Sequence, residues 1–557
     1  MTLALAGFEE MPDPEYFGSL DDDETDGIPP NARPEIRMSH ELADNVDSAC
    51  KAMRVDRNVY HRNAELVHIV RATPEDAAAS SVTVDGQTRV RIVEGTPSVH
   101  PVAVSTLRER LTRVAVFKKY SAKGKGWKSE IPTNDIVSAL HTRRQWPGIR
   151  ELAGIIETPS MRPDGALIVE PGYDRSTKFL YSPTLAFPPV PDAPTQAEAA
   201  VALRELVDVF SDFPFASEPS RYVPIAALLT LIARPAIVGA VPAFLFDAPT
   251  PGTGKSLCAD AVSIIATGRG APRGTFPPQV EELEKVLSAY ALRGAAVIGF
   301  DNLDTGFGGA PLDKVLTASD TVDLRVLGQS QIAELRWLAV ILVSGNNLVV
   351  LRDTARRVLI SRLESTLERP EERTGFSHYP LIPWVQEQRA RLVVCALTVL
   401  RAYVVAGRPS TKIVFGSFEG WSALIAEAIV FAGGANVLGA RPNEDAGDSG
   451  ERGAIAAILA WWPKLDVDGK GLSVRTVIDV LYPKQRADPH EPPDGFDGLR
   501  EAIEEFAPLH NGRPDPKKLG NQLRRFKRRI VGGAFLVQVN DRKGVAKWTV
   551  QKTGGAP

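Results

Sequence analysis

The segment from Phe244 to Ser256 joins an apolar run to a glycine-rich turn that ends in Gly254, Lys255 and Ser256. Such a turn lets consecutive backbone N–H groups face a polyphosphate at a helix N-terminus, while the lysine reaches the outer phosphates and the serine hydroxyl helps to hold Mg²⁺. The segment departs from the GxxxxGKS/T motif once, because Pro249 stands where the first glycine is expected. We therefore expect a loop that binds ATP. Its predicted contact residues are Pro251, Gly252, Thr253, Gly254, Lys255, Ser256 and Leu257.

Two further strand ends predict the partners of this loop. Ala295–Asp301 is an apolar run that ends in a carboxylate, and Trp337–Asn346 is another that ends in small polar residues. In a parallel α/β sheet these ends lie at one edge, so Asp301, together with Ser256, would hold Mg²⁺, and Asn346 would position the attacking water. Taken singly, Asp301 could instead cap a helix and Asn346 could be a turn residue. A loop for a ligand other than ATP is the remaining alternative.

Arginines follow the second polar strand end, within Leu351–Arg362. An arginine at this place can reach the γ-phosphate of a neighbouring subunit and supply charge to the transition state. Arg356 and Arg357 are the candidates for this role, with Arg362 as a third. Alternatively, these arginines cap a helix or bind acids locally. The first interpretation requires an oligomer.

The general base is left open by the sequence. Asn302 follows Asp301, where ring ATPases commonly place a glutamate, and an amide cannot accept the proton. Glu282, in the helix expected before this strand, and Asp304, just after it, are the two alternatives.

Thr321–Trp337 predicts a β-hairpin, because two strand-like arms flank a Gly-Gln-Ser-Gln turn. In a ring ATPase, a hairpin inserted here points into the central channel. Arg325 and Gln329 are the residues that we expect to contact single-stranded DNA there.

Several of these segments together resemble a known family. The phosphate loop, Phe-Asp-Asn-Leu (300–303), Leu-Gly-Gln-Ser (327–330), Ser-Gly-Asn-Asn (344–347) and Asp-Thr-Ala-Arg-Arg (353–357) look like phage and prophage replication ATPases, which are related to superfamily 3 helicases of the AAA+ class in the poxvirus-type primase–helicase group. Arg162–Tyr173 and Gly416–Ser422 extend the resemblance to roughly residues 150–430.

The resemblance implies a hexameric ring that moves along single-stranded DNA by ATP hydrolysis. It assigns the ATPase roles to Lys255, Ser256, Asp301, Asn346 and Arg356 or Arg357. The chain departs from the family pattern at Pro249 and at Gln329, where a lysine that contacts phosphate is expected.

Length and composition limit the class of protein. The chain has 557 residues, which is too long for one core and indicates several domains. Its 44% apolar and 24% charged residues are typical of a soluble globular protein. The three cysteines have no CxxC spacing, which favours a reducing compartment over a disulfide framework or a zinc site. No apolar run reaches the ~18 residues of a membrane span, so we expect a cytoplasmic protein without membrane contact.

The expected fold class is α/β, with an AAA+ P-loop ATPase core, a helical lid, an N-terminal α+β module and a C-terminal winged-helix domain. The predicted parts are an acidic disordered arm (1–40), the N-terminal module (41–186), a proline linker (187–198), the ATPase core (199–377), the lid (378–442) and the winged-helix domain (450–552). The N-terminal module shows no paired-carboxylate strand motif and no Cys/His cluster. We therefore expect a separate primase as a partner rather than a primase domain in this chain.

The C-terminal region is basic, with twelve bases and two acids in residues 513–552. Leu519, Leu523, Phe526 and Ile530 have helical spacing, and two strand-like runs follow, in the order of a winged helix. Such a domain binds duplex DNA through a groove helix and phosphate contacts. The expected contacts are Lys517, Lys518, Arg524, Arg525, Arg528, Arg542 and Lys543. A solvated basic surface and a winged helix that binds protein are the alternatives.

These features together predict an ATP-driven replicative DNA helicase of a mobile element. One alternative is an ATP-dependent origin-binding initiator or helicase loader without processive unwinding. The other is an AAA+ ATPase that remodels protein in a defence system.

Overall fold

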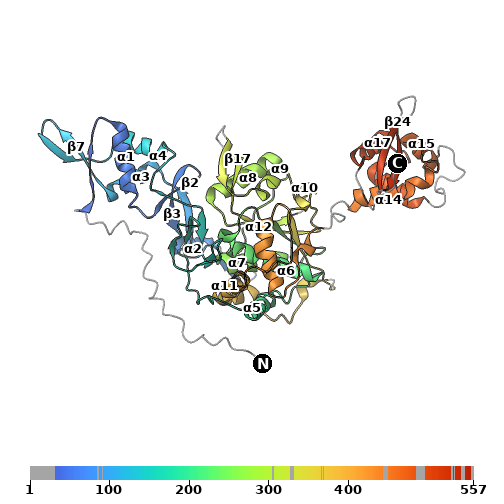
Figure 1. Cartoon of the computed structure of the whole chain (residues 1–557), viewed down its shortest axis with the longest axis horizontal. Coiled ribbons are helices and arrows are strands. Elements are labelled where there is room, and N and C mark those ends of the chain that lie inside the picture. Colours follow the sequence, from blue (N-terminus) through green and yellow to red (C-terminus); the bar gives the residue numbers. More distant parts are fainter. Residues whose placement is uncertain are drawn as a thin grey trace. The chain divides into compact units, whose positions relative to one another are not determined.

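The computed structural model describes residues 32–552, except for 85–86, 91, 304–305, 327–331, 366, 368, 443–448, 484–495, 529–530, 532–533 and 541–545. The chain forms two compact units, Met1–Arg441 and Pro442–Pro557 (Figure 1). Both units combine helices with β-sheets, which confirms the expected α/β class. Among the described helices, none is long and apolar enough to cross a lipid bilayer.

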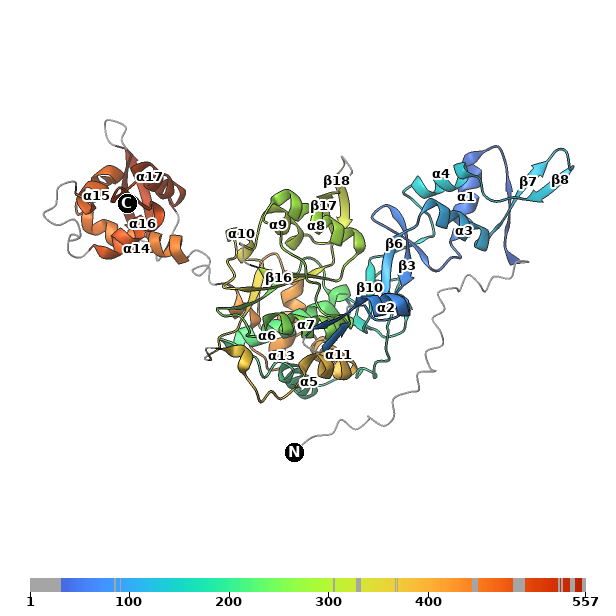
Figure 2. The same ribbon diagram turned by 180° about the vertical axis from the view of Figure 1, so that it is seen from behind.

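The larger unit begins with an α+β module (Figure 2). Strands β1-β7-β8 form one sheet and β6-β3-β2-β9 another. Helices α1, α3 and α4 enclose a core in which Leu107, Leu111 and Val137 are fully buried. The elements are β1 (Glu35–Met38), α1 (Leu42–Met53), β2 (Val59–Arg62), β3 (Glu65–Arg71), α2 (Pro74–Ser80), β4 (Ser81–Val84), β5 (Gln87–Val90), β6 (Pro97–Pro101), α3 (Val104–Val114), β7 (Val116–Ser121), β8 (Gly126–Ser129), α4 (Asn134–Thr142) and β9 (Arg150–Glu151).

Strand β1 corrects the predicted extent of the acidic arm. The acidic composition predicts a disordered arm over residues 1–40, but Glu35–Met38 pairs in parallel with β7. The strand forms because apolar and polar residues alternate here: Ile36 and Met38 are buried, while Glu35 and Arg37 are exposed. Residues 1–31 of the predicted arm lie outside the described part of the chain.

Short strands and a proline-rich segment lead from this module to the core. The strands are β10 (Gly154–Ile156), β11 (Ser160–Met161), β12 (Leu167–Ile168), β13 (Gly172–Tyr173) and β14 (Phe179–Tyr181). Helix α5 (Gln196–Asp208) then starts with a capping box. The Glu198 N–H donates to Thr195 Oγ1 at 3.3 Å, and the Thr195 N–H donates to Glu198 Oε2 at 2.7 Å. The proline-rich segment therefore ends in a helix cap.

A four-stranded parallel sheet of order β16-β19-β15-β20 lies in the larger unit. Its strands are β15 (Ala243–Ala248), β16 (Val297–Leu303), β19 (Val340–Asn346) and β20 (Val358–Arg362). In β15, Phe244 and Phe246 pack with α6 (Glu218–Ile232) and α7 (Lys255–Thr267), whereas Leu245 packs with α8 (Val280–Arg293). Both faces of the sheet are covered, which explains why its strands are continuous apolar runs.

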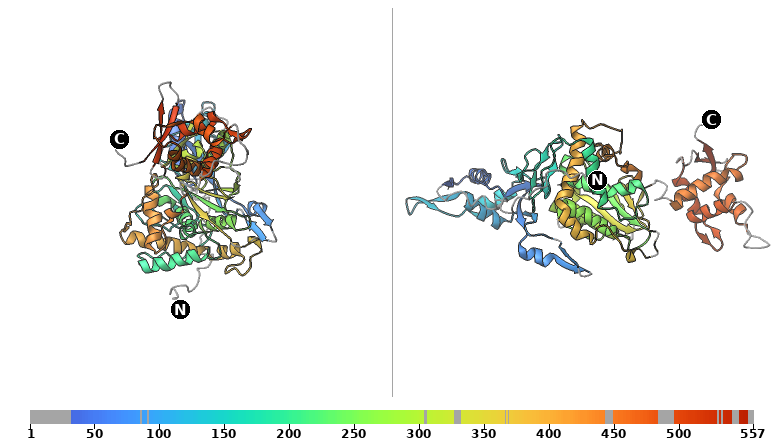
Figure 3. Two further views of the ribbon diagram at one scale, coloured as in Figure 1. Left: turned by 90° about the vertical axis from the view of Figure 1, so that its right-hand side faces the viewer. Right: turned by 90° about the horizontal axis from the view of Figure 1, so that it is seen from below.

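The segment predicted as a helical lid packs directly on this core. Helix α11 (Leu381–Val405) lies against α5 and α7, as Figure 3 shows for the long yellow-orange helix beside the green ones. After it come α12 (Glu419–Trp421), a π-helical turn (Ser422–Ala426) and α13 (Glu427–Phe431). Trp421 is fully buried, and its Nε1 donates to Thr230 Oγ1 of α6 at 2.7 Å. The lid segment and helices α5 to α7 therefore share one hydrophobic core.

The smaller unit has its own core around Trp462 and Trp548. The Trp462 Nε1 donates to the Trp548 carbonyl at 2.8 Å. Strands β21, β25 and β24 form an antiparallel sheet in that order. The elements are α14 (Ser449–Leu465), β21 (Leu472–Ser473), α15 (Val474–Leu481), α16 (Asp497–Phe506), β22 (Leu509–His510), β23 (Arg513–Pro514), α17 (Pro516–Arg525), β24 (Ala534–Asn540) and β25 (Ala546–Lys552).

The predicted basic helix is shorter than its apolar spacing indicated. Leu519, Leu523 and Phe526 are buried as expected, but α17 ends at Arg525 rather than continuing to Ile530. Arg528 has a φ of 60°, which an α-helix does not allow, and its N–H donates to the Leu536 carbonyl of β24. The chain therefore leaves the helix at Arg525, before Ile530, and Arg528 already bonds to β24 of the antiparallel sheet.

Candidate nucleotide-binding site

The phosphate loop predicted from the sequence connects the carboxyl end of β15 to α7, which begins at Lys255. Gly252 and Gly254 have φ values of 74° and 91°, in the left-handed region that other residues rarely adopt. A Cβ added at Gly254 would also lie 2.8 Å from the ring of Phe213. The loop therefore needs glycine at the two places where the sequence has it, and Pro249 lies at its exposed start.

The Lys255 ammonium group lies within the loop. Its Nζ donates to the Thr250 carbonyl at 3.1 Å and to Thr253 Oγ1 at 3.3 Å. Burial lowers the pKa of Lys255, although Asp247 and Asp301 act in the opposite direction. Both acceptors are neutral, so an anionic phosphate oxygen would be a stronger partner for this cation.

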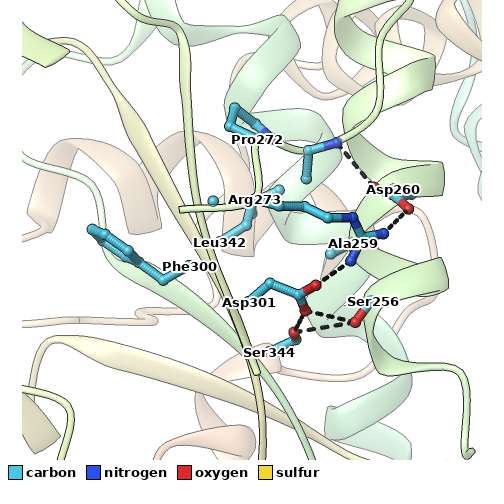
Figure 4. A pocket seen from close by; sticks show the side chains of 11 residues that line it. Ser256, Ala259, Asp260, Pro272, Arg273, Phe300, Asp301, Leu342 and Ser344 are labelled. Carbon is cyan, nitrogen blue, oxygen red and sulfur yellow. Dashed lines mark hydrogen bonds and ion pairs between the residues drawn. The ribbon is translucent and has the colours of Figure 1, made fainter. Parts of the chain in front are cut away.

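The Asp301 carboxylate, at the end of β16, meets two hydroxyl groups (Figure 4). Ser256 Oγ donates to Asp301 Oδ1 at 2.7 Å, and Ser344 Oγ of β19 donates to the same oxygen. The two serine oxygens are 3.3 Å apart. Burial alone would raise the pKa of Asp301, but these hydrogen bonds and the charge of Arg273 outweigh it and lower that pKa. The carboxylate is therefore held in its ionised form.

Arg273 is a residue of this site that sequence reasoning missed. Its guanidinium group lies between two carboxylates: one nitrogen bonds Asp301 Oδ2 and another bonds Asp260 Oδ2 of α7 at 2.6 Å (Figure 4). The Asp301 N–H donates to the Gly274 carbonyl at 3.1 Å, which fixes this loop beside β16. Ser344 was also missed. A signal for it existed, since it lies two positions before Asn346 and so faces the same side of β19.

Two buried polar atoms near the loop have no hydrogen-bond partner among the described residues: Thr250 Oγ1 and Asn346 Oδ1. Asn346 pairs in register with Ala248, the last residue of β15, which places it beside the loop. Its neighbour Asn347 donates from Nδ2 to the Pro249 carbonyl at 3.4 Å. An unpaired buried polar group costs about 1–3 kcal/mol, so these two oxygens mark a place for a ligand or for water.

The three candidate arginines lie in different surroundings. Arg357 is 13% exposed and donates to Asp313 Oδ1 at 2.6 Å and to the Asp353 carbonyl at 2.6 Å. Arg362 forms an ion pair with Asp247 of β15. Arg356 is 65% exposed, and its ion pair with Asp353 is long, at 3.7 Å. Of the three, Arg356 alone directs most of its side chain to solvent.

The structure places one candidate general base and leaves the other undescribed. Glu282 is exposed in the first turn of α8 and forms a 2.6 Å ion pair with Lys285. No contact joins it to Lys255, Ser256 or Asp301 within the described residues. Asp304 lies outside the described residues.

The residues present fit ATP and Mg²⁺. Ser256, Ser344 and Asp301 supply the hydroxyl and carboxylate oxygens that Mg²⁺ prefers, and Lys255 and the N-terminus of α7 supply positive charge for phosphates. No group of three or more His, Cys, Asp or Glu side chains that could hold a metal ion occurs in the described residues. A metal here would thus take most of its ligands from phosphate and water, as Mg²⁺ commonly does.

The predicted hairpin is confirmed as β17 (Thr321–Arg325) paired in antiparallel register with β18 (Ile332–Arg336). Arg325 is exposed, but the register places Asp323 and Glu334 on the same face. At the base, Arg336 forms an ion pair with Glu151 at 2.7 Å. The tip with Gln329 lies outside the described residues.

The predicted DNA contacts of the smaller unit are partly placed. The described ones are all exposed, on α17 or just after it: Lys517, Lys518, Arg524, Arg525 and Arg528. Asp515 caps α17, since its Oδ1 accepts the N–H of Lys517 at 2.7 Å. Arg542 and Lys543 lie outside the described residues.

Comparisons with known proteins give only distant likenesses. No family model matches the chain, and no curated protein matches its sequence. Among solved structures, the apo C-terminal region of NrS-1 is similar at 11% identity and a TM-score of 0.37, over 82% of this chain and 93% of that one. The JCV helicase is similar at 15% identity and a TM-score of 0.20, over 44% of this chain and 74% of that one. Likenesses at these scores assign no activity to the chain.

Proposed function

We propose that this chain is an ATPase that acts on DNA, and that it works as a replicative helicase of the superfamily 3 type in a mobile element. The observation that supports this most directly is the meeting of Lys255, Ser256, Asp301 and Asn346 at one edge of a parallel sheet. These residues come from three strand ends, and they belong to the motifs by which the chain resembles that family.

Each residue has a role in the proposed site. Lys255 and the N-terminus of α7 would bind the phosphates of ATP, and Ser256 and Asp301 would hold Mg²⁺, which supplies positive charge to the transferring phosphoryl group. Asn346 Oδ1, which has no partner among the described residues, would orient the attacking water. Arg362 forms an ion pair with Asp247, and Arg357 donates to two acceptors, so both arginines are bound to partners in their own chain. Arg356 is thus our candidate for the arginine that reaches a neighbouring subunit's ATP.

The DNA contacts are proposed from exposed charge. Arg325 and Gln329 would face single-stranded DNA in a hexameric ring, and α17 with its neighbouring bases would bind duplex DNA as part of a winged helix. The order α17, β24, β25 at the end of the smaller unit, a helix followed by two antiparallel strands, supports the second assignment. A separate primase would supply primers.

DNA-stimulated ATP hydrolysis tests this proposal. We expect ATP turnover that depends on Mg²⁺ and that rises when single-stranded DNA is added to the purified full-length chain. Turnover that no DNA changes, but that an unfolded protein substrate raises, would instead favour the protein-remodelling alternative. An initiator or loader would show stimulation by duplex origin DNA and no unwinding.

A further inference from the structure

The hairpin β7–β8 of the N-terminal module carries exposed aromatic side chains among lysines. Tyr120 is 54% exposed and Trp127 is 41% exposed, although large aromatic rings are usually buried in a core. The two residues are direct cross-strand partners, and their ring centroids lie 5.6 Å apart at an angle of 70°. This contact stabilises the hairpin but leaves a large part of both rings in solvent.

The register shows which side chains share the aromatic face. Lys118 precedes Tyr120 by two positions and pairs with Arg37 of β1, so both bases lie on the same face as the rings. The Arg37 guanidinium carbon lies 5.4 Å from the centroid of the Trp127 ring. The opposite face is the one that packs inward, because Ile36 and Phe117 are buried in the module's core.

Positive charge is concentrated on this hairpin. Residues 116–130 contain five lysines and one acid. Lys118 forms an ion pair with Glu35, whereas the other four lysines are exposed and have no carboxylate partner among the described residues. Lys123 and Lys125 lie in the turn beside the rings, and Lys119 and Lys128 are cross-strand partners on the opposite face. Figure 2 shows the hairpin extending beyond α1, α3 and α4.

We propose that the aromatic face of β7–β8 binds single-stranded DNA, with Tyr120 and Trp127 stacking on bases and the surrounding lysines contacting phosphates. Ring surfaces and cations at this spacing match the two parts of a nucleotide chain. The partner is single-stranded because bases in a duplex are already stacked on one another and cannot reach a protein ring. The choice of DNA over RNA rests on the proposed function.

The test measures equilibrium binding of a labelled oligo(dT) of about 15 nucleotides to the full-length chain, without ATP or Mg²⁺. The variant Tyr120→Ala/Trp127→Ala should bind at least about tenfold more weakly, since each stacked base contributes measurably to affinity. Trp127→Phe should keep most of the affinity, because phenylalanine also stacks. Tyr379→Ala removes a ring that is 76% exposed elsewhere in the unit and should change nothing.

Two further measurements locate the contact. Substituting Lys123 and Lys125 by Gln should reduce the slope of log affinity against log salt by about 1.4, since each phosphate contact to a single strand contributes about 0.7. An oligonucleotide with 5-iododeoxyuridine should crosslink to a peptide within residues 116–130.

The proposal is overturned if the double variant binds oligo(dT) within twofold of the wild type, if no crosslink falls in this segment, or if the variant loses duplex binding to the same extent. Tighter binding of oligo(U) than of oligo(dT) would overturn the assignment to DNA. Binding is measured without nucleotide, so a failed ATPase proposal would leave these results unaffected.

Discussion

The edge of the parallel sheet and the surfaces proposed for DNA are built in opposite ways. At the sheet edge, charged groups are partly buried and held by named partners: Asp301 by two serines and Arg273, and Lys255 by the loop itself. On α17, the basic side chains are exposed. The Arg524 side chain, for example, donates only to Asn521 of its own helix among the described residues. Preorganised, partly desolvated groups suit chemistry, whereas exposed cations suit a long, variable polyanion.

The two hairpins of the larger unit differ in a related way. On β17–β18, Arg325 shares its face with Asp323 and Glu334, so that face has little net positive charge. On β7–β8, two exposed rings share their face with Arg37 and Lys118, and Lys123 and Lys125 lie in the adjoining turn. The family resemblance therefore indicates β17–β18 as the DNA contact, whereas the exposed side chains favour β7–β8.

The contrast between the sheet edge and the exposed surfaces can be tested by substitution. Substitutions at the sheet edge should stop ATP hydrolysis without loss of DNA binding, and substitutions on the surfaces should weaken DNA binding without loss of basal hydrolysis.

The largest effect is expected for Lys255→Ala. This change removes the cation inside the phosphate loop, and we expect ATP turnover to fall to background in a coupled ATPase assay. Binding of duplex DNA without nucleotide should be unchanged, because Lys255 is far in the sequence from the basic helix and is buried. Unchanged turnover would remove the proposed nucleotide site.

A smaller loss of ATP turnover is expected for Arg356→Ala, and Arg357→Ala is its matched control. Arg356→Ala should lower turnover by about a thousandfold if this arginine reaches a neighbouring subunit's ATP. Mixing Arg356→Ala with Lys255→Ala subunits should restore part of the activity, since a mixed assembly contains sites with both intact groups. Arg357→Ala should instead lower the free energy of unfolding by about 1 kcal/mol, because Asp313 loses its ion pair and, among the described residues, keeps only the hydrogen bond from Thr354. No rescue in the mixture would contradict a shared site.

Removing Arg273 should change the pH dependence of hydrolysis. Arg273 helps to lower the pKa of Asp301, so Arg273→Ala should raise that pKa. As the pH falls, the carboxylate would then be protonated earlier, and activity would be lost at a higher pH than in the wild type. Arg269→Ala, which breaks an ion pair with Glu157 instead, is the control. Identical acid limbs in all three proteins would show that Arg273 does not influence the reacting carboxylate.

On the surface of α17, replacing Lys517, Lys518, Arg524 and Arg525 by Gln should weaken duplex binding with little change in basal hydrolysis. If all four contact phosphates, the salt slope should fall by about 4, since each contact to B-DNA contributes about 0.9. Binding titrations at several salt concentrations measure this. An equal loss of basal ATPase activity would contradict a separate role for the smaller unit.

The smallest effect is expected for Arg325→Ala. One exposed base among two acids should contribute little to affinity, so we expect a decrease of a few-fold in DNA-stimulated turnover and no change in basal turnover. Asp323→Ala on the same face serves as the control and should not weaken the stimulation. A loss of all stimulation in Arg325→Ala would make β17–β18 the principal DNA contact.

The strand-end residues could be predicted because parallel strands bring their carboxyl ends together by geometry alone. Asp301 and Asn346 each end an apolar run, and Lys255 ends a glycine-rich turn, so local pattern was enough to predict that they lie at one edge of the sheet. Arg273 could not be found in this way. It belongs to a loop, and it reaches Asp301 because the Gly274 carbonyl pairs with the backbone of β16, a contact between distant segments.

Other differences have similar physical causes. Adjacent arginines look equivalent in a sequence, and only the position of Asp313 distinguishes Arg357 from Arg356. Helical spacing predicted that the basic helix would reach Ile530, but entry into β24 ends it at Arg525. In the N-terminal arm, the acidic composition hid the alternation of Ile36 and Met38 that forms β1.

Strand separation on forked DNA tests the central claim most directly. We expect the full-length chain to unwind a labelled fork in the presence of ATP and Mg²⁺, and the Lys255→Ala variant to bind the fork without unwinding it. A wild-type chain that hydrolyses ATP in response to DNA and yet separates no strands would contradict the helicase assignment.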